Sequence, residues 1–404
     1  MYSRMLKLHL NIVIFVALFF TWHITRADTQ FSVTERTYKK LETVERLIQQ
    51  KKEKEALNIL EKLESSTKNK SYELTLVYQA FGYIYYNSNR LDKALDYFEK
   101  CLALNSAPVT ALQNIRRNLM QIYSQTNNYN KAIDHFTIWL KKEASPSADI
   151  LALGGILYAY IKDYEAAIQY LQKAIKTANP AKESWYNALL SIYYEKNDLH
   201  SAIALLNQLT ILYSGNSEYW KQLFNAYYLN NNLERALSTL QLAYTNQLLN
   251  NKEDIITLAK LNIYLGCPIN SVKLINNELK SGLLKHDETT LELLATAYLQ
   301  SQETEQAALV YAQLARLTHD PKRSLFAARL FLEAKDWNNV IEVLEDTVPN
   351  LDNGQAHLLK GMAFMSLNQE DHAMREFTIA KQDTDTYTNA IQWIEYLNQI
   401  EFIR

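Results

Sequence analysis

Apolar and polar residues follow a pattern that returns about every 35 residues along this chain. A small or β-branched residue opens an amphipathic stretch ten times, at spacings of 38, 38, 35, 35, 34, 36, 35, 33 and 33 residues. These anchor positions are Ala56, Ala94, Ala132, Ala167, Ala202, Ala236, Val272, Ala307, Val340 and Ala373. A large residue lies nine residues before each anchor, at the packing positions Leu47, Tyr85, Tyr123, Tyr158, Tyr193, Tyr227, Ile263, Tyr298, Phe331 and Phe364.

A bulky residue lies four positions after each anchor. Asn276 breaks the apolar rule among these ten positions. The other members are Leu60, Phe98, Phe136, Leu171, Leu206, Leu240, Tyr311, Leu344 and Phe377. Because residues three or four apart share one face of an α-helix, each period predicts two amphipathic helices joined by a turn.

Proline and asparagine mark the ends of these helices. We expect Pro108, Pro146, Pro180, Pro321 and Pro349 between successive helix pairs, and Pro268 in the turn inside the seventh pair. We place the asparagine clusters 127–128, 230–232 and 338–339 in the turn within a pair, where Asn tolerates a left-handed backbone.

The residue three before the packing position predicts how closely the two helices of a pair approach. It is small at Gly82, Gly155, Ala295, Ala328 and Gly361. In other repeats it is large, at Met120, Leu190 and Phe224, or charged, at Lys260. We therefore expect close helix approach in the first group and different packing in the second.

This pattern resembles the tetratricopeptide (TPR) repeat, W-x2-L-G-x2-Y, then A-x3-F, then P, with a period of 34. A good match runs from Tyr78 through Phe81, Gly82 and Tyr85, with Ala94 and Phe98 after it. The resemblance implies an all-α, right-handed TPR α-solenoid of about ten helical pairs, over about residues 34–386. Residues 388–400 predict a C-terminal capping helix, and we expect residues 28–404 to be one solenoid domain.

The first 27 residues have the pattern of a cleavable signal peptide. Arg4 and Lys7 precede a nine-residue apolar run at 12–20, and Thr25 and Ala27 place small residues before a cleavage site after Ala27. An uncleaved anchor is the alternative, but spanning a bilayer needs roughly 20 apolar residues. No later stretch approaches that length. We therefore expect an exported, periplasmic mature protein without a membrane span.

Charge and motif content exclude several functional classes. The 42 Lys and Arg against 44 Asp and Glu give a net charge of −2, without the basic excess that nucleic-acid binding requires. The eight glycines form no nucleotide-binding signature, and the histidines lack metal-ligand spacing. We expect no catalytic residue, no cofactor and no metal site, and free thiols at Cys101 and Cys267, which are five repeats apart.

In TPR domains the first helix of each pair lines a concave groove, and the resemblance implies the same arrangement here. The candidate partner-binding residues are Tyr83, Tyr86, Asn87, Arg117, Asn187, Tyr194, Lys221, Asn225, Tyr228 and Tyr264. Aromatic, Arg and amide side chains suit a protein or peptide ligand. Lys221 and Asn225 resemble the first half of the TPR carboxylate clamp, but Asp254, Thr257 and Leu261 leave its second half incomplete.

Several longer segments resemble exported bacterial TPR proteins that accompany TonB/ExbB/ExbD-type systems in Gram-negative bacteria. They are RTYKKL (36–41), GYIY (82–85), ESWY (183–186), YLGCP (264–268), EAKDW (333–337) and QWIEYL (392–397). This resemblance implies a non-enzymatic periplasmic adaptor for TonB-dependent outer-membrane uptake, with TonB/ExbB/ExbD-type components as partners. A general periplasmic scaffold for envelope assembly or cell-wall synthesis stays open. An enzyme with a solenoid arm would need a catalytic domain, and only 18 residues (404 − 386) follow the repeats.

Overall fold

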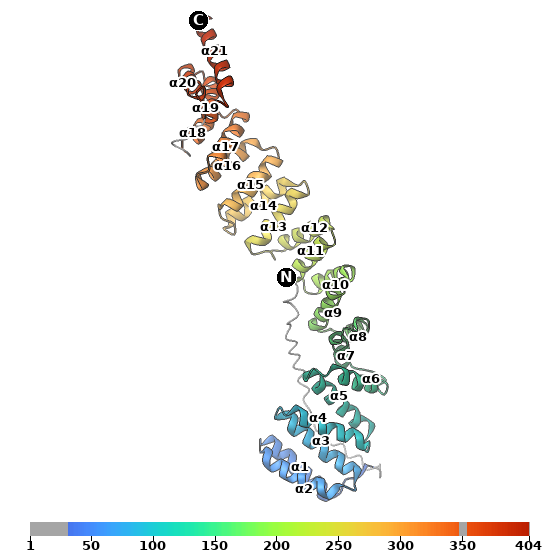
Figure 1. Cartoon of the computed structure of the whole chain (residues 1–404). Coiled ribbons are helices and arrows are strands. Elements are labelled where there is room, and N and C mark those ends of the chain that lie inside the picture. Colours follow the sequence, from blue (N-terminus) through green and yellow to red (C-terminus); the bar gives the residue numbers. More distant parts are fainter. Residues whose placement is uncertain (1–30, 347–353, 404) are drawn as a thin grey trace. The chain divides into compact units, whose positions relative to one another are not determined.

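A computed structural model describes residues 31–346 and 354–403, and these residues form twenty-one α-helices and no strand (Figure 1). The expected signal peptide (1–27) and Pro349 lie outside the described residues. The first ten helices are α1 (Glu35–Gln49), α2 (Glu53–Thr67), α3 (Ser71–Asn87), α4 (Leu91–Leu104), α5 (Val109–Gln125), α6 (Tyr129–Leu140), α7 (Ala148–Tyr160), α8 (Tyr164–Thr177), α9 (Glu183–Glu195) and α10 (Leu199–Leu212). The others are α11 (Ser217–Leu229), α12 (Leu233–Thr245), α13 (Lys252–Tyr264), α14 (Pro268–Ser281), α15 (Glu288–Gln300), α16 (Thr304–Thr318), α17 (Pro321–Glu333), α18 (Trp337–Asp346), α19 (Gly354–Ser366), α20 (Glu370–Ala380) and α21 (Tyr387–Ile403).

The chain divides into two compact units, unit 1 up to Ile192 and unit 2 from Tyr193. Ten helix pairs follow one another from α1/α2 to α19/α20, and α21 comes after the last pair. The expected all-α fold of ten pairs with a terminal helix is therefore confirmed over the described residues. The expectation of a single solenoid domain stays a prediction.

The ten predicted anchor residues are all buried, nine of them completely. Three of the predicted close approaches are visible at glycines. A Cβ on Gly82 would lie 2.7 Å from the Phe98 ring, and one on Gly361 would lie 2.4 Å from the Phe377 ring. A Cβ on Gly155 would lie 2.7 Å from Leu171. Small side chains therefore let the bulky residue of the second helix reach the first helix.

Every turn within a pair contains one residue in the left-handed conformation, with φ between 54° and 75°. The next N–H then donates to the carbonyl of the packing residue, as Arg90 does to Tyr85 at 2.8 Å. Asn127 and Asn231 occupy this position as predicted. The prediction for Asn338 and Asn339 is wrong: they lie in the first turn of α18, and Lys335 holds the left-handed position. These turns end the first helix in the manner of a Schellman motif.

The predicted register of the seventh pair (α13/α14) is wrong by one residue. The turn N–H of Cys267 donates to the carbonyl of Asn262 at 2.8 Å, so Asn262 and not Ile263 holds the packing position. The anchor nine residues later is Ser271, which is 0% exposed, and not Val272. The Ser271 hydroxyl donates to the carbonyl of Ala259 at 2.7 Å.

The two apparent exceptions of the seventh pair follow from that register. The buried bulky residue four after the anchor is Ile275, not Asn276, and the small residue three before the packing position is Ala259, not Lys260. The sequence pattern favoured apolar Val272 over Ser271, although a hydrogen-bonded hydroxyl can be buried at little cost.

The corrected register also explains the tyrosines at packing positions. In three repeats the phenol of the packing tyrosine forms a hydrogen bond with a polar side chain of the preceding repeat. That polar residue lies five positions after the anchor of the preceding repeat. Tyr123 donates to Glu99 at 2.8 Å, Asn207 donates to Tyr227 at 3.1 Å, and Asn276 donates to Tyr298 at 3.0 Å. Where the next packing residue is Phe331, the equivalent position holds the buried Ala312. These tyrosines therefore belong to the packing between repeats, as the sequence predicts.

The last helix packs on the tenth pair through one face. Ala390 and Leu397 of α21 are buried, and the Trp393 ring stacks on Phe377 with centroids 5.6 Å apart. The outward face carries Gln392, Glu395 and other exposed polar residues, which suits a capping helix.

Cys101 is buried in α4 and Cys267 precedes α14, and both thiols are free. No helix between residues 31 and 346 or between 354 and 403 combines the length and hydropathy needed to cross a bilayer. Within the same ranges, no group of three His, Cys, Asp or Glu side chains could hold a metal ion.

Candidate functional site

Unit 1 contains a groove of about 460 Å³ over the first helices α5 and α7 and the start of α9. The walls come from helices that hold equivalent positions in successive repeats. Because successive repeats stack on one another, the equivalent faces of these helices lie next to one another. The lining residues are Arg117, Asn118, Gln121, Ser124, Gln125, Asn127, Tyr129, Ser147, Asp149, Ile150, Ala152, Leu153, Ile156, Tyr160, Lys182, Ser184 and Trp185. We refer to this set as the unit 1 groove.

The unit 1 groove has an apolar floor and one aromatic wall. Ile156 and Trp185 are buried within it. The rings of Tyr129 and Tyr160 stack in parallel, with centroids 4.4 Å apart and an interplanar angle of 1°. The Tyr129 hydroxyl donates to the Asn127 side chain at 2.7 Å, which fixes the orientation of the pair. An apolar side chain of a ligand would therefore find a preformed surface here.

Neutral hydrogen bonds order the polar wall. The Gln121 side chain donates to the Tyr86 phenol at 3.0 Å, and Gln125 donates to the same oxygen at 3.5 Å. Asn118 donates to the Tyr83 phenol at 3.3 Å. Because these bonds run from α5 to α3, they join the second and third pairs across the surface that leads into the groove.

Three charged side chains line the groove, and two of them form an ion pair with each other. Lys182 forms an ion pair with Asp149, and its ammonium also lies 5.4 Å from the Trp185 ring centroid. Arg117 is half-buried as a residue, and its guanidinium has no ion-pair partner among the residues that the structure describes. The groove therefore presents one uncompensated positive charge.

The predicted site residues of unit 1 lie in different surroundings. Arg117 lines the groove, and the half-buried Tyr86 bonds to two of the amides just described. Tyr83 is only 8% exposed, with its ring edge-on to Phe98 at 5.4 Å, so most of its surface is used in packing. Asn87 is exposed at the end of α3, and Asn187 is half-buried in α9. Their role in binding stays a prediction.

The predicted site residues of unit 2 do not line the hollow between α15 and α17 that is described below. Lys221 pairs with Asp254 at 2.7 Å, so the lysine of the incomplete clamp is already bound within the chain. Tyr194 is half-buried and Asn225 is exposed. Tyr228 is 55% exposed and Tyr264 is 74% exposed.

The register of the seventh pair also moves Tyr264 relative to Tyr228. Tyr228 follows its packing residue Tyr227 by one position, whereas Tyr264 follows Asn262 by two. Ile263 therefore holds the position equivalent to Tyr228.

Sequence reasoning missed most of the groove floor. Ile156 lies two residues before the packing residue Tyr158, as Gln121 does before Tyr123, so the repeat register could have identified it. Lys182 immediately precedes α9 and Trp185 lies in its first turn, and only the spacing between neighbouring helices brings them to the groove.

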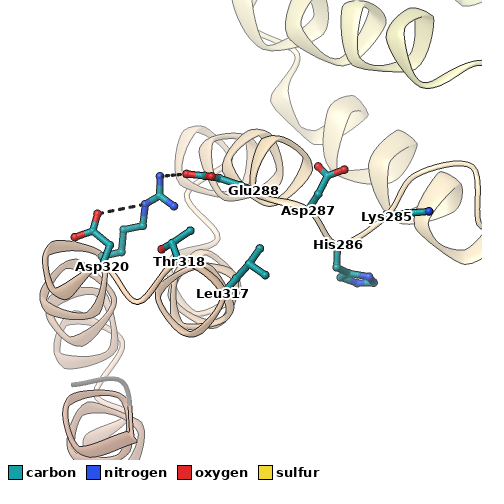
Figure 2. Close-up of a pocket in the computed structure, with 8 residues that line it drawn as sticks. Lys285, His286, Asp287, Glu288, Leu317, Thr318 and Asp320 are labelled. Atoms are coloured by element: carbon teal, nitrogen blue, oxygen red, sulfur yellow. Dashed lines mark ion pairs between the residues drawn. The ribbon is translucent and has the colours of Figure 1, made fainter. Parts of the chain in front are cut away.

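A larger hollow of about 850 Å³ lies in unit 2, between the start of α15 and the start of α17 (Figure 2). Arg323 forms ion pairs with Glu288 at 2.8 Å and with Asp320 at 3.7 Å, drawn as dashed lines in Figure 2. Asp287 accepts a hydrogen bond from the Thr290 N–H at 3.0 Å and pairs with Lys252 at 2.6 Å. These charges cap helices and link repeats, so this hollow is a weaker candidate for a binding site than the unit 1 groove.

Comparison with known proteins identifies the repeats. Residues 76–108 and 148–179 match one tetratricopeptide-repeat family model, and residues 290–325 match another. The chain therefore carries TPR repeats, and its all-α architecture is that of a TPR α-solenoid. Comparison with curated proteins finds no match.

Three solved structures illustrate the likeness in fold. The chain is 15% identical to a chain in the structure of Naa15/Naa10 bound to HypK-THB, with a TM-score of 0.45, 89% of this chain covered and 66% of that chain spanned. It is 13% identical to a tetratricopeptide repeat protein from Parabacteroides merdae, with a TM-score of 0.39 and coverage of 65% and 99%. It is 19% identical to YrrB, described as a TPR protein with an unusual peptide-binding site, with a TM-score of 0.36 and coverage of 45% and 89%. These likenesses are too distant to indicate a partner.

Proposed function

We propose that the chain is a non-enzymatic adaptor that holds a segment of another protein in the unit 1 groove. TPR proteins typically mediate protein–protein interactions, and three segments of this chain match TPR models. The observation that carries the proposal is the groove itself, with its buried apolar floor, its ordered amides and its one uncompensated cation. Such a combination of apolar surface and a few fixed polar groups suits specific recognition.

We further propose that this adaptor works in the periplasm, as a component of a TonB-dependent outer-membrane transport system. The support comes from the sequence, namely the apolar run at 12–20 with its basic start and the segments that resemble exported TPR proteins of TonB/ExbB/ExbD-type systems. A general scaffold for envelope assembly or cell-wall synthesis is the competing role.

In-cell photo-crosslinking tests the proposal directly. A photoreactive amino acid replaces Ser184, an exposed residue that lines the groove, in the full-length protein. The matched control carries it at Lys173, an exposed position on α8 outside the groove. We expect adducts with TonB/ExbB/ExbD-type components from position 184 and not from position 173. Adducts with cell-wall synthesis proteins would favour the competing role, and equal labelling at both positions would refute binding in the groove.

Fractionation and mass measurement test the location. The proposal requires a periplasmic protein with the mass of residues 28–404. A membrane-bound chain that retains Met1 would contradict it. Growth of a deletion strain on substrates that need TonB-dependent uptake then tests the transport role, which normal growth would refute.

A further inference from the structure

The unit 1 groove contains three charged side chains, and two of them neutralise each other. Asp149 is paired with Lys182, which leaves Arg117 as the source of the net charge of the groove. Because Arg117 has no carboxylate partner among the described residues, it can pair with a ligand carboxylate without breaking another ion pair, and a ligand that covers the two groups reduces their screening by water.

The amides around Arg117 are oriented but not fully used. A primary amide has two N–H donors and one carbonyl acceptor. The Tyr86 phenol receives one N–H from Gln121 and one from Gln125, and the Tyr83 phenol receives one from Asn118. Each of these amides lines the groove and keeps further hydrogen-bonding capacity. That capacity matches the alternating N–H and C=O groups of an extended peptide.

The floor of the groove adds a second requirement on the ligand. Ile150 and Leu153 are half-buried and offer apolar surface above the buried Ile156, beside the stacked pair Tyr129 and Tyr160. An apolar side chain on the ligand would cover this surface and remove it from water, which favours binding.

We propose that the unit 1 groove selects an extended segment of a partner protein with an internal Asp or Glu, whose carboxylate pairs with Arg117, and an apolar side chain nearby that fills the floor. The proposal rests on the protein-binding function given above and adds the chemistry of the ligand. Charge complementarity with Arg117 commits it to a ligand that carries a carboxylate, and the hypothesis is that an Asp or Glu side chain supplies it.

The test is a selection from phage-displayed random linear 12-residue peptides on the full-length protein. The displayed peptides are joined to the coat protein at their C-terminus, so they have no free C-terminal carboxylate. Every carboxylate that is selected therefore belongs to an Asp or Glu side chain. We expect enrichment of peptides that combine Asp or Glu with an apolar residue at a constant spacing. A synthetic peptide of the enriched sequence, labelled with fluorescein, then reports affinity by anisotropy.

Arg117→Gln is the decisive variant, and Arg116→Gln is its matched control. Arg116 is also half-buried and adjacent in sequence, but it does not line the groove. Hydrogen bonds to charged groups are worth about 1.5–3 kcal/mol, so Arg117→Gln should weaken binding roughly tenfold to a hundredfold. Replacing the acid of the peptide by its amide should cause a similar loss in the wild type and little further loss in Arg117→Gln. Arg116→Gln should change affinity less than about threefold.

The outcomes separate this inference from the proposed function. Enriched peptides without an acid, or equal losses in the two arginine variants, would overturn the inference and leave peptide binding in place. No enriched peptide would overturn both. Enrichment of Arg117-dependent acidic peptides would support the inference even if crosslinking in cells captured no component of a TonB system.

Discussion

Two regions of this chain, α3–α5 in unit 1 and α11–α15 in unit 2, tie neighbouring first helices together by different chemistry. Between α3 and α5 the links are neutral, such as Gln121 to the Tyr86 phenol, although Asp149 and Lys182 form an ion pair farther along the same unit. In unit 2 they are ionic, such as Lys221 with Asp254 and Lys252 with Asp287. Neutral links in unit 1 leave the charge of Arg117 available to a ligand, whereas the lysines and Arg323 in unit 2 are engaged within the chain. This difference is the reason for placing the proposed recognition surface in unit 1 and not in unit 2.

The largest expected effect tests whether each unit depends on its own core. Phe136 of unit 1 is fully buried and lies edge-on to Tyr170 at 5.0 Å. Phe136→Ala should reduce the free energy of unfolding by about 3–5 kcal/mol, because it removes buried surface and leaves a cavity. Hydrogen exchange measured by mass spectrometry should show the greatest loss of protection in α5–α8.

Phe377→Ala is the counterpart in unit 2, since Phe377 is also fully buried. It should cause the same size of loss, centred on α19–α21. A Phe136→Ala protein whose protection fell mainly in unit 2 would contradict the division into two units.

The next effect tests the register of the seventh pair in unit 2. Ser271→Leu puts a large side chain into a fully buried anchor and should cost about 1–3 kcal/mol from overpacking. Val272→Leu is the control, and it should cost less than Ser271→Leu, because it adds one methylene at a position that keeps 7% exposure and breaks no hydrogen bond. Thermal or denaturant unfolding of the two variants shows which substitution lowers the free energy of unfolding more. The reverse order of cost would restore Val272 as the anchor.

Acid should weaken the start of unit 1 through Glu73. Burial raises the pKa of this carboxyl, but hydrogen bonds from the Thr37 hydroxyl, the Thr34 N–H and Lys70 outweigh burial and hold the pKa below its usual value. Its stabilisation is therefore complete above the unfolded Glu pKa of about 4.3 and is lost as pH falls through the lower folded value. Protection of α1 should fall over this range.

Glu73→Gln provides the check on this prediction. It should remove most of that pH dependence and cost about 1–2 kcal/mol at neutral pH. Asp287→Asn is the control in unit 2, because Lys252 similarly lowers the pKa of the Asp287 carboxyl. That variant should leave the acid response of α1 intact. An unchanged response in Glu73→Gln would show that another group controls it.

The smallest effect tests the contrast between neutral and ionic links. Lys221→Met in unit 2 and Tyr86→Phe in unit 1 should each cost less than about 1 kcal/mol. Raising the ionic strength from about 0.1 M to about 1 M shortens the Debye length from about 10 Å to about 3 Å. The cost of Lys221→Met should shrink in the higher salt, while that of Tyr86→Phe should not. Equal salt dependence of the two variants would remove the contrast.

The repeat pattern could be predicted from sequence because it rests on burial of one helix face. Ala94 and Phe98 must meet the preceding helix in every stacking arrangement, and Gly82 reports how closely it approaches. The seventh pair shows the limit of this reasoning. Ser271 is buried because the carbonyl of Ala259 accepts its hydroxyl, and a pattern of apolar residues contains no information about that partner.

The candidate site was harder to predict, since side-chain partners decide which residues stay available. Arg117 was predicted and lines the unit 1 groove, whereas Lys221 was predicted and is bound to Asp254. The repeat after Lys221 places the carboxylate of Asp254 beside its ammonium, whereas no described residue forms an ion pair with Arg117. Trp185 reaches the groove only because α9 packs where it does, which no spacing within one repeat encodes.

The hydrogen bonds that packing tyrosines form across repeat boundaries limit how such a chain can lose or gain repeats during evolution. A recombination event that deletes one helix pair brings the polar residue of one repeat against the packing residue of a new neighbour. Glu99 beside another tyrosine would preserve the bond, whereas the buried Ala312 beside a tyrosine would leave a phenol without a partner. The segment that recombination must keep intact therefore begins at the polar residue of one repeat and ends at the packing tyrosine of the next repeat. This segment includes the junction between two helix pairs.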